Sequence, residues 1–129
     1  MGTGAVSWSS CLQTLHTTST TQSEYVAAVA AGQGIPWLRN LFTEIGFSVS
    51  LVLPMCIGNQ SAIQVAKNPE HCGRMKHLDL CFYWLRGTVH SGVIVLKCVP
   101  TAELVADFMT KALTRIKVAE MRMLLGLRS

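Results

Sequence analysis

Four potential metal ligands lie close together near the middle of the chain. The stretch "HCGRMKHLDLC" holds His71, Cys72, His77 and Cys81 within eleven residues. Imidazole nitrogens and thiolate sulfurs are the usual ligands of structural zinc. The spacing is not a usual zinc pattern, because two of the residues are adjacent and Cys81 falls on the apolar stripe of an expected helix. We therefore expect a loop and a core cysteine here, and no zinc.

Two acidic residues, Glu24 and Asp107, lie in segments with helical patterns. By local rules Glu24 is a first-turn acid that complements the dipole of its helix. Asp107 stands four residues before Lys111, and such a spacing predicts a surface ion pair worth ~0.3–0.5 kcal/mol. Read locally, both acids therefore have structural roles.

The apolar pattern of the first half predicts strand, helix, strand and helix. Val6 and Trp8 alternate with serines, as in a half-buried strand. A helix follows in "QSEYVAAVAAG", capped by Thr20 or Thr21, and Pro36 predicts a break or kink before helical spacing resumes up to Gly46. The expected central strand, "SVSLVLPMCI", contains a proline that must lie at a bulge or at the strand's end.

The second half continues the alternation of helices and strands. Asn59 or Ser61 can cap the short helix "AIQVAKN", and a longer helix is expected from Leu78 to about Ser91. "VIVLKCV" predicts a second buried strand, followed by a last helix capped by Thr101 and by more helix in the basic tail. The order predicts a mixed α/β domain with its later strands parallel.

Composition limits the classes of protein to consider. A chain of 129 residues with 50% hydrophobic and 14% charged residues fits one globular domain, and its longest apolar run is too short to span a bilayer. No membrane association is expected. The five cysteines are odd in number and scattered, which favours free thiols and a cytoplasmic or nuclear location. The net charge of +4 suits an anionic partner such as nucleic acid.

Four stretches, in this order, resemble the ribonuclease H domain at the C-terminal end of copia-type retrotransposon Pol polyproteins. They are "GAVSWSS", "STTQSEYVAAVAAG", "CIGNQSAIQVAKNPEHCGRMKHLDL" and "VPTAELVADFMTKAL". The resemblance covers nearly the whole chain, so residues 1–129 are expected to form one partial ribonuclease H-like domain. It implies a mixed sheet flanked by helices. It also implies an enzyme that cuts the RNA strand of an RNA/DNA hybrid, with four acidic residues holding two Mg²⁺ ions.

The resemblance assigns these acids position by position. Glu24 matches the family's helix glutamate, and Asp107 matches the aspartate of its last helix. The family has "DN" before "QSAI" where this chain has "GN", so Gly58 replaces the third acid. The first acid belongs to a central strand that the family places upstream of "GAVSWSS", and that strand is expected to be missing here. Arg74, Lys76 and His77 are expected as weak contacts to nucleic acid.

The expected function follows from the two acids that are lacking. Two carboxylates cannot neutralise two Mg²⁺ ions, so metal binding should be weak or lost, and the rate should fall on the order of a thousandfold or more. The chain is then a remnant of a hybrid-cutting enzyme, with the rest of the Pol polyprotein as a partner if it is expressed in frame. Two alternatives stay open: a non-catalytic module that binds nucleic acid or protein, and a transposon-derived open reading frame without function.

Overall fold

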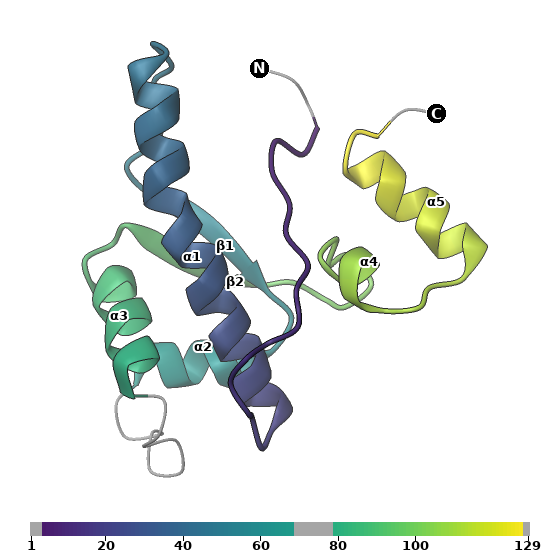
Figure 1. Ribbon diagram of the computed structural model, residues 1–129, viewed down its shortest axis with the longest axis horizontal. Coiled ribbons are helices and arrows are strands. Elements are labelled where there is room, and N and C mark those ends of the chain that lie inside the picture. The colour runs from purple at the N-terminus through teal and green to yellow at the C-terminus, as the bar shows by residue number, and fades with distance from the viewer. Residues whose placement is uncertain (1–3, 69–78, 128–129) are drawn as a thin grey trace. The chain divides into compact units, whose positions relative to one another are not determined.

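The computed structural model describes residues 4–68 and 79–127. In these residues the chain forms a mixed α/β structure of five helices and a two-stranded sheet, in the order α1 (Thr20–Glu44), β1 (Leu53–Ile57), α2 (Gln60–Lys67), α3 (Asp79–His90), β2 (Ile94–Cys98), α4 (Asp107–Thr110) and α5 (Arg115–Leu124). Figure 1 shows these elements along the chain. By their internal contacts the elements form two compact units, a sheet unit of residues 15–99 and a terminal unit of residues 1–14 and 100–129.

The two strands of the sheet unit are parallel, as the sequence predicted. Leu53 lies opposite Ile94, and Ile57 lies opposite Cys98. The amide of Leu53 donates to the carbonyl oxygen of Val93 at 3.0 Å. Helices α2 and α3 form the connection between the strands, because parallel neighbours cannot be joined by a tight hairpin turn.

Pro54 is the second residue of β1 and costs the sheet no hydrogen bond. The amide of Leu53 and the carbonyl of Ile57, which accepts from the amide of Val99 at 3.1 Å, both face β2. Backbone groups alternate in direction along a strand, so the nitrogen of Pro54 faces the opposite edge. Proline is tolerated at such an edge because no donor is needed there.

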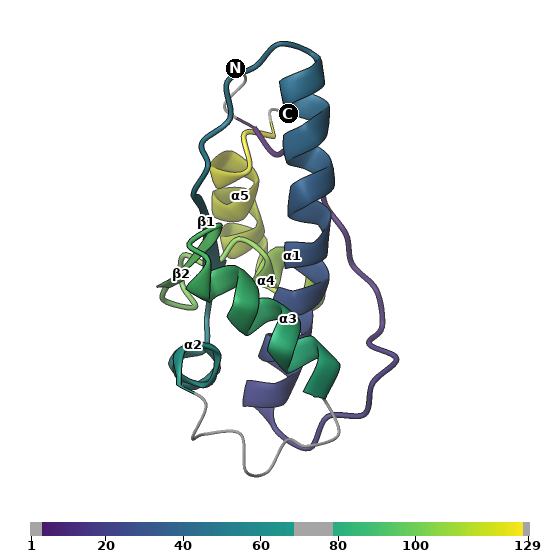
Figure 2. The same ribbon diagram turned by 90° about the vertical axis from the view of Figure 1, so that its left-hand side faces the viewer.

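One face of the sheet carries the core of this unit. Met55, Ile57, Ile94 and Leu96 are buried on that face, where they join residues from three helices: Tyr25, Ala28 and Val29 of α1, Ala62, Ile63, Val65 and Ala66 of α2, and Leu85 of α3. Figure 2 shows these helices beside the strands. Cys56 and Val95, which lie between these residues in the strands, are exposed, and Cys98 at the end of β2 is exposed as well.

Helix α1 is continuous where the sequence predicted a break. Pro36 lies inside it, and the residue is exposed. Its missing amide leaves the carbonyl of Gly32 without the usual helical donor. The buried residues of α1 all precede Pro36, and the helix continues after it as a half-buried and exposed segment. The helix ends as expected before Gly46, whose φ of +86° is in the left-handed region that favours glycine.

Two predictions for the terminal unit are wrong. The segment around Val6 and Trp8 forms no strand, and these side chains are 74% and 72% exposed. An alternating pattern becomes a strand only beside a partner, and neither described strand pairs with it. The last helix is also shorter than expected, because α4 begins at Asp107 and the residues after Thr101 form turns.

Contacts between its two chain segments organise the terminal unit. The amide of Ala5 donates to the carbonyl oxygen of Leu125 at 3.0 Å. The hydroxyl of Ser10 donates to the carbonyl oxygen of Met109 at 3.1 Å. Helix α5 begins with Thr114 as its cap, in agreement with the helical tail predicted from the sequence. In the described part of the chain, no helix combines the length and apolar character needed to cross a membrane.

Candidate functional site

Glu24 is positioned by the capped beginning of α1. The cap is Ser19, one residue before the expected candidates, and its hydroxyl oxygen accepts from the amide of Gln22 at 3.3 Å. The buried side chain of Gln22 accepts in turn from the amide of Thr18 at 2.7 Å. This pair resembles a capping box. In that motif the side chain of the cap residue and the side chain of the residue three positions later each accept a hydrogen bond from a backbone amide at the start of the helix. The start of α1 is therefore fixed.

The side chain of Glu24 has no structural partner in the described part of the chain. It is half-buried, and the residue after it, Tyr25, is fully buried in the core. Because the helix begins at Thr20, Glu24 lies beyond the first turn, and the expected role as a first-turn acid is wrong. The burial of Tyr25 fixes the backbone of α1 at this point, and the carboxylate of Glu24 remains available to a ligand.

Gly58 lies at the corner between β1 and α2, as the sequence predicted. Ile57 before it is buried, and Asn59 after it caps α2, with the side-chain oxygen accepting from the amides of Ser61 at 2.9 Å and Ala62 at 3.2 Å. Gly58 itself does not have a positive φ. Since its backbone conformation is open to any L-residue, the turn does not require glycine. An aspartate could adopt this backbone.

Asp107 is the first residue of α4 and is paired with Lys111. Its carboxylate oxygen Oδ2 accepts from the ammonium group of Lys111 at 2.7 Å. The side chain of Asp107 is only 8% exposed, whereas that of Lys111 is 52% exposed. The predicted ion pair is therefore confirmed, but its acid is buried and not at the surface. A metal ion at this carboxylate would have to displace the lysine.

These residues do not fit a site for two Mg²⁺ ions. Gly58 offers no side-chain donor, and the carboxylate of Asp107 is already paired with Lys111, which leaves Glu24 as the one unpaired acid at these three positions. Over residues 4–68 and 79–127, no three His, Cys, Asp or Glu side chains form a group that could hold a metal. The zinc candidates His71, Cys72 and His77 lie outside the described residues, and the side chain of Cys81 is not described. Arg74 and Lys76 also lie outside them.

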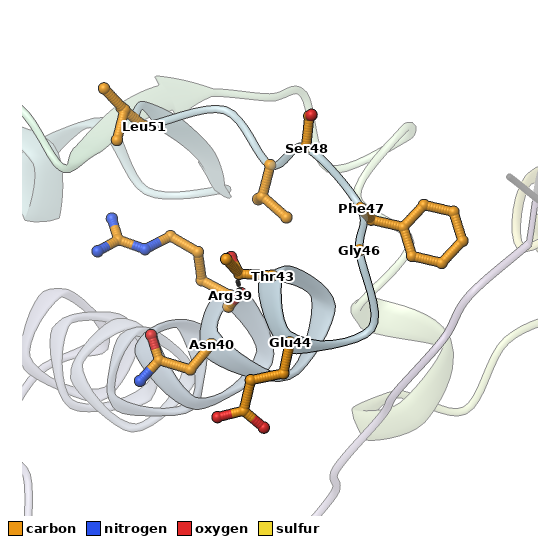
Figure 3. A pocket seen from close by; sticks show the side chains of 9 residues that line it. Arg39, Asn40, Thr43, Glu44, Gly46, Phe47, Ser48 and Leu51 are labelled. Carbon is orange, nitrogen blue, oxygen red and sulfur yellow. Dashed lines mark hydrogen bonds between the residues drawn. The ribbon is translucent and has the colours of Figure 1, made fainter.

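Two hollows of the sheet unit were not predicted from the sequence. One, of about 760 Å³, lies where α1 gives way to residues 46–51. Figure 3 shows Arg39 extending into it beneath Leu51, while Glu44 and Phe47 point away. The hydroxyl of Thr43 donates to the carbonyl oxygen of Arg39 at 2.8 Å, so this hydroxyl already has a hydrogen-bond partner within α1. Of the two charged side chains that line this hollow, Arg39 extends into it and Glu44 points away.

The second hollow, of about 700 Å³, lies between the C-terminal part of α2 and one side of α3. Among the described residues, its lining includes the basic side chains of Lys67, Arg86 and His90. The signal in the sequence was the four-residue spacing of Arg86 and His90 on one helix face. Local reading missed the hollow because Lys67 joins them only when α2 packs against α3.

The comparisons with known proteins point to one class of relatives. Over 126 residues, 98% of its length, the chain is 35% identical to the retrovirus-related Pol polyprotein from transposon TNT 1-94 of Nicotiana tabacum. It is 32% and 30% identical to the corresponding polyproteins from transposons RE2 and RE1 of Arabidopsis thaliana, over 90% and 89% of its length. No family model matches the chain, and no solved structure matches it significantly.

The homologues of this chain are thus retrovirus-related Pol polyproteins of plant transposons. The chain spans less than a tenth of their length, between 8% and 9%. The matched region includes the corner at Gly58 and the helices that carry Glu24 and Asp107, because the first alignment covers almost every residue of the chain.

Proposed function

We propose that this chain is a segment of a retrotransposon Pol polyprotein, descended from its ribonuclease H domain, and that the 129 residues by themselves have little or no cleavage activity. The ancestral reaction is hydrolysis of the RNA strand of an RNA/DNA hybrid. The proposed location is cytoplasmic or nuclear, with the remainder of the Pol polyprotein as partner if it is expressed in frame. The homology along nearly the full chain supports the descent.

The observation that carries the loss of activity is the corner at Gly58. It has the arrangement of a buried strand end followed by a capped helix, where α/β folds place ligands and catalytic groups. The family's aspartate would stand there, and the backbone does not require glycine. Glycine in place of that aspartate removes one metal ligand, and the backbone at this position does not need a glycine. The ion pair between Lys111 and Asp107 lowers the charge available to a cation further.

Hydrolysis of a labelled hybrid is the direct test of the inactive state. The purified chain is incubated with a hybrid labelled on the RNA strand, in Mg²⁺ and separately in Mn²⁺, and the products are resolved by length. We expect no cleavage above that of a protein-free sample. Turnover that is lost in Glu24→Gln, which keeps the shape of the side chain and removes its charge, would overturn the proposal of inactivity.

The descent has its own test, which requires the DNA immediately upstream of the Met1 codon. If that DNA encodes an acidic strand in frame, a polypeptide extended by this strand and carrying Gly58→Asp regains all four acids of the family. We expect this polypeptide to cut the RNA strand of a hybrid and to leave single-stranded RNA intact. A folded form with no such cleavage would contradict descent from a ribonuclease H.

A binding module without catalysis is a second candidate, favoured by the net charge of +4. Salt-sensitive binding to a hybrid without cleavage would support it. The third possibility, an open reading frame without function, predicts that no folded protein is recovered from the source cells or on expression.

A further inference from the structure

Helix α1 carries apolar residues on two opposite sides. Tyr25, Ala28 and Val29 are buried in the core of the sheet unit. Another set is exposed, and we call it the second face of α1: Ala27, Ala30, Gly34, Trp37, Leu41 and the cap residue Ile45. An α-helix turns by about 100° per residue, so Gly34 points roughly 160° away from Gly32, the buried glycine two positions before it. The second face therefore lies on the side of α1 away from the core.

The second face is apolar and open in the part of the chain that the structure describes. The side chains of Trp37, Leu41 and Ile45 are 65%, 38% and 58% exposed, and a Cβ atom at Gly34 would meet no atom within 4 Å. In Figure 2 the second half of α1 extends beyond α2 and α3. The charged residues of α1 lie outside this face; they are Glu24, Arg39 and Glu44. Contiguous exposed apolar surface of this kind marks a contact with another macromolecule.

The spacing of the second face indicates that another helix covers it. Its residues from Ala27 to Leu41 follow one another at alternating steps of three and four residues. This is the heptad spacing of a coiled-coil seam, which forms a narrow stripe along one side of a helix. A single helix lying along the seam buries such a stripe completely. A sheet or a globular surface would need a broader apolar face.

The order of residue sizes along the seam indicates a second copy of the same helix. Small residues fill its first half, up to Gly34, and large ones follow from Trp37 onwards. In an antiparallel pair related by a two-fold axis, Gly34 of one copy faces Trp37 of the other and Ala30 faces Leu41, because both pairs are centred on the same point of the helix. Each large side chain then meets a small one. A parallel pair would set Trp37 against Trp37 and leave a gap at Gly34, which close packing disfavours.

We propose that the second face of α1 binds the same face of a second copy of this chain, with the two helices antiparallel. The seam from Ala27 to Ile45 is eighteen residue steps long, about 27 Å. A single helix pair of this length buries less than the ~1,200 Å² at which standard interfaces begin, so the dimer is weak. We expect a dissociation constant on the order of 100 µM. This inference does not rest on the proposed function, because association is measured without nucleic acid or cleavage.

Sedimentation equilibrium over a series of protein concentrations measures the association. A reducing agent is kept in the buffer, because Cys11, Cys56 and Cys98 are exposed free thiols that could otherwise link copies covalently. Trp37→Ala removes the largest side chain of the second face, and Trp8→Ala removes a tryptophan of similar exposure, 72%, from outside α1. We expect Trp37→Ala to weaken the dimer about 10-fold or more, as for a central interface tryptophan, and Trp8→Ala to weaken it less than about twofold.

Two charge variants at facing positions test the orientation. Ala30→Glu and Leu41→Lys each place a charge in an apolar seam, so each variant alone should associate more weakly than the wild-type chain. In an antiparallel mixture the two new charges face each other, so the mixture should associate about fivefold or more tightly than either variant alone. The control Asn40→Glu adds the same charge as Ala30→Glu at an exposed position on another side of α1, and it should leave the association nearly unchanged.

Three results would overturn the proposal. The first is a wild-type chain that stays monomeric at about ten times the expected dissociation constant, which would leave the second face to a helix of a different polypeptide. The second is equal affinity of the Trp37→Ala and Trp8→Ala variants when both are shown to be folded by circular dichroism. The third is a mixture of the Ala30→Glu and Leu41→Lys variants that associates no more tightly than either alone, which would exclude the antiparallel register.

Discussion

Two glycines of α1 lie in opposite surroundings, and this difference predicts opposite effects of the same substitution. A Cβ atom at Gly32 would lie 2.9 Å from Cζ3 and 3.0 Å from Cη2 of Trp84, and 3.3 Å from Cε of Met55. A Cβ atom at Gly34 would meet nothing within 4 Å. Contacts below about 3 Å between carbon atoms force a displacement, so alanine at position 32 must push the indole of α3 away from α1.

The magnitudes follow from two opposing effects. Alanine is favoured over glycine inside a helix by about 1 kcal/mol, so Gly34→Ala should raise the free energy of unfolding by roughly 0.5–1 kcal/mol. Gly32→Ala has the same gain, but overpacking of a well-packed interface costs roughly 1–3 kcal/mol. The net change at Gly32 is then a loss of up to about 2 kcal/mol. The two variants should differ by about 1–3 kcal/mol.

Urea denaturation followed by far-ultraviolet circular dichroism measures both changes, with the wild-type chain as reference. Tryptophan emission gives a second readout, because Trp84 is partly buried against the core whereas Trp8 and Trp37 are 72% and 65% exposed. We expect a change in emission in Gly32→Ala and none in Gly34→Ala. If Gly32→Ala stabilised the chain as much as Gly34→Ala does, α1 and α3 would not pack as described.

Three further predictions concern single residues. Pro36→Ala restores the donor to the carbonyl of Gly32 at an exposed position of α1, and it should raise the free energy of unfolding by about 2–3 kcal/mol; no gain in a urea titration would show that the helix is broken there. Lys111→Met leaves the buried Asp107 carboxylate without its partner and should lower the free energy of unfolding by about 1–2 kcal/mol. The control Lys117→Met removes a lysine from an exposed pair with Glu120 and should change that free energy by less than about 0.5 kcal/mol. Equal effects of the two variants in thermal melts would contradict the difference in burial. Gly58→Asp in the 129-residue chain should fold normally and still not cut a labelled hybrid in Mg²⁺, because one acid does not complete the family's four; cleavage by this single variant would refute our account of the missing acids.

Local sequence rules located the corner at Gly58, on which the proposed loss of activity rests. The alternation of the strand up to Ile57 and the capping side chain of Asn59 are short-range features, so the junction around Gly58 could be predicted without a structure. The resemblance to a family then predicts that this glycine replaces an acid. The parallel pairing of the two strands also followed from the order of the elements.

Local rules failed where distant parts of the chain decide the outcome. The alternation at Val6 and Trp8 predicted a strand, but pairing depends on a partner that the local sequence does not contain. Pro36 predicted a break or a kink, but α1 runs through this position as one helix, so the break did not occur. The burial of Asp107 also depends on the surrounding structure, because its spacing from Lys111 is the same in a surface pair.

By itself the sequence therefore determined the class of fold, the strand-to-helix corner and the identity of the residue at that corner, because these depend on neighbours within a few positions. Only the tertiary structure decided which charges share a surface. Lys67 and Arg86 are nineteen residues apart, and they line one hollow because the apolar sides of α2 and α3 pack together. Burial of those apolar sides brings the two helices into contact, and the cations beside them are brought together as a result.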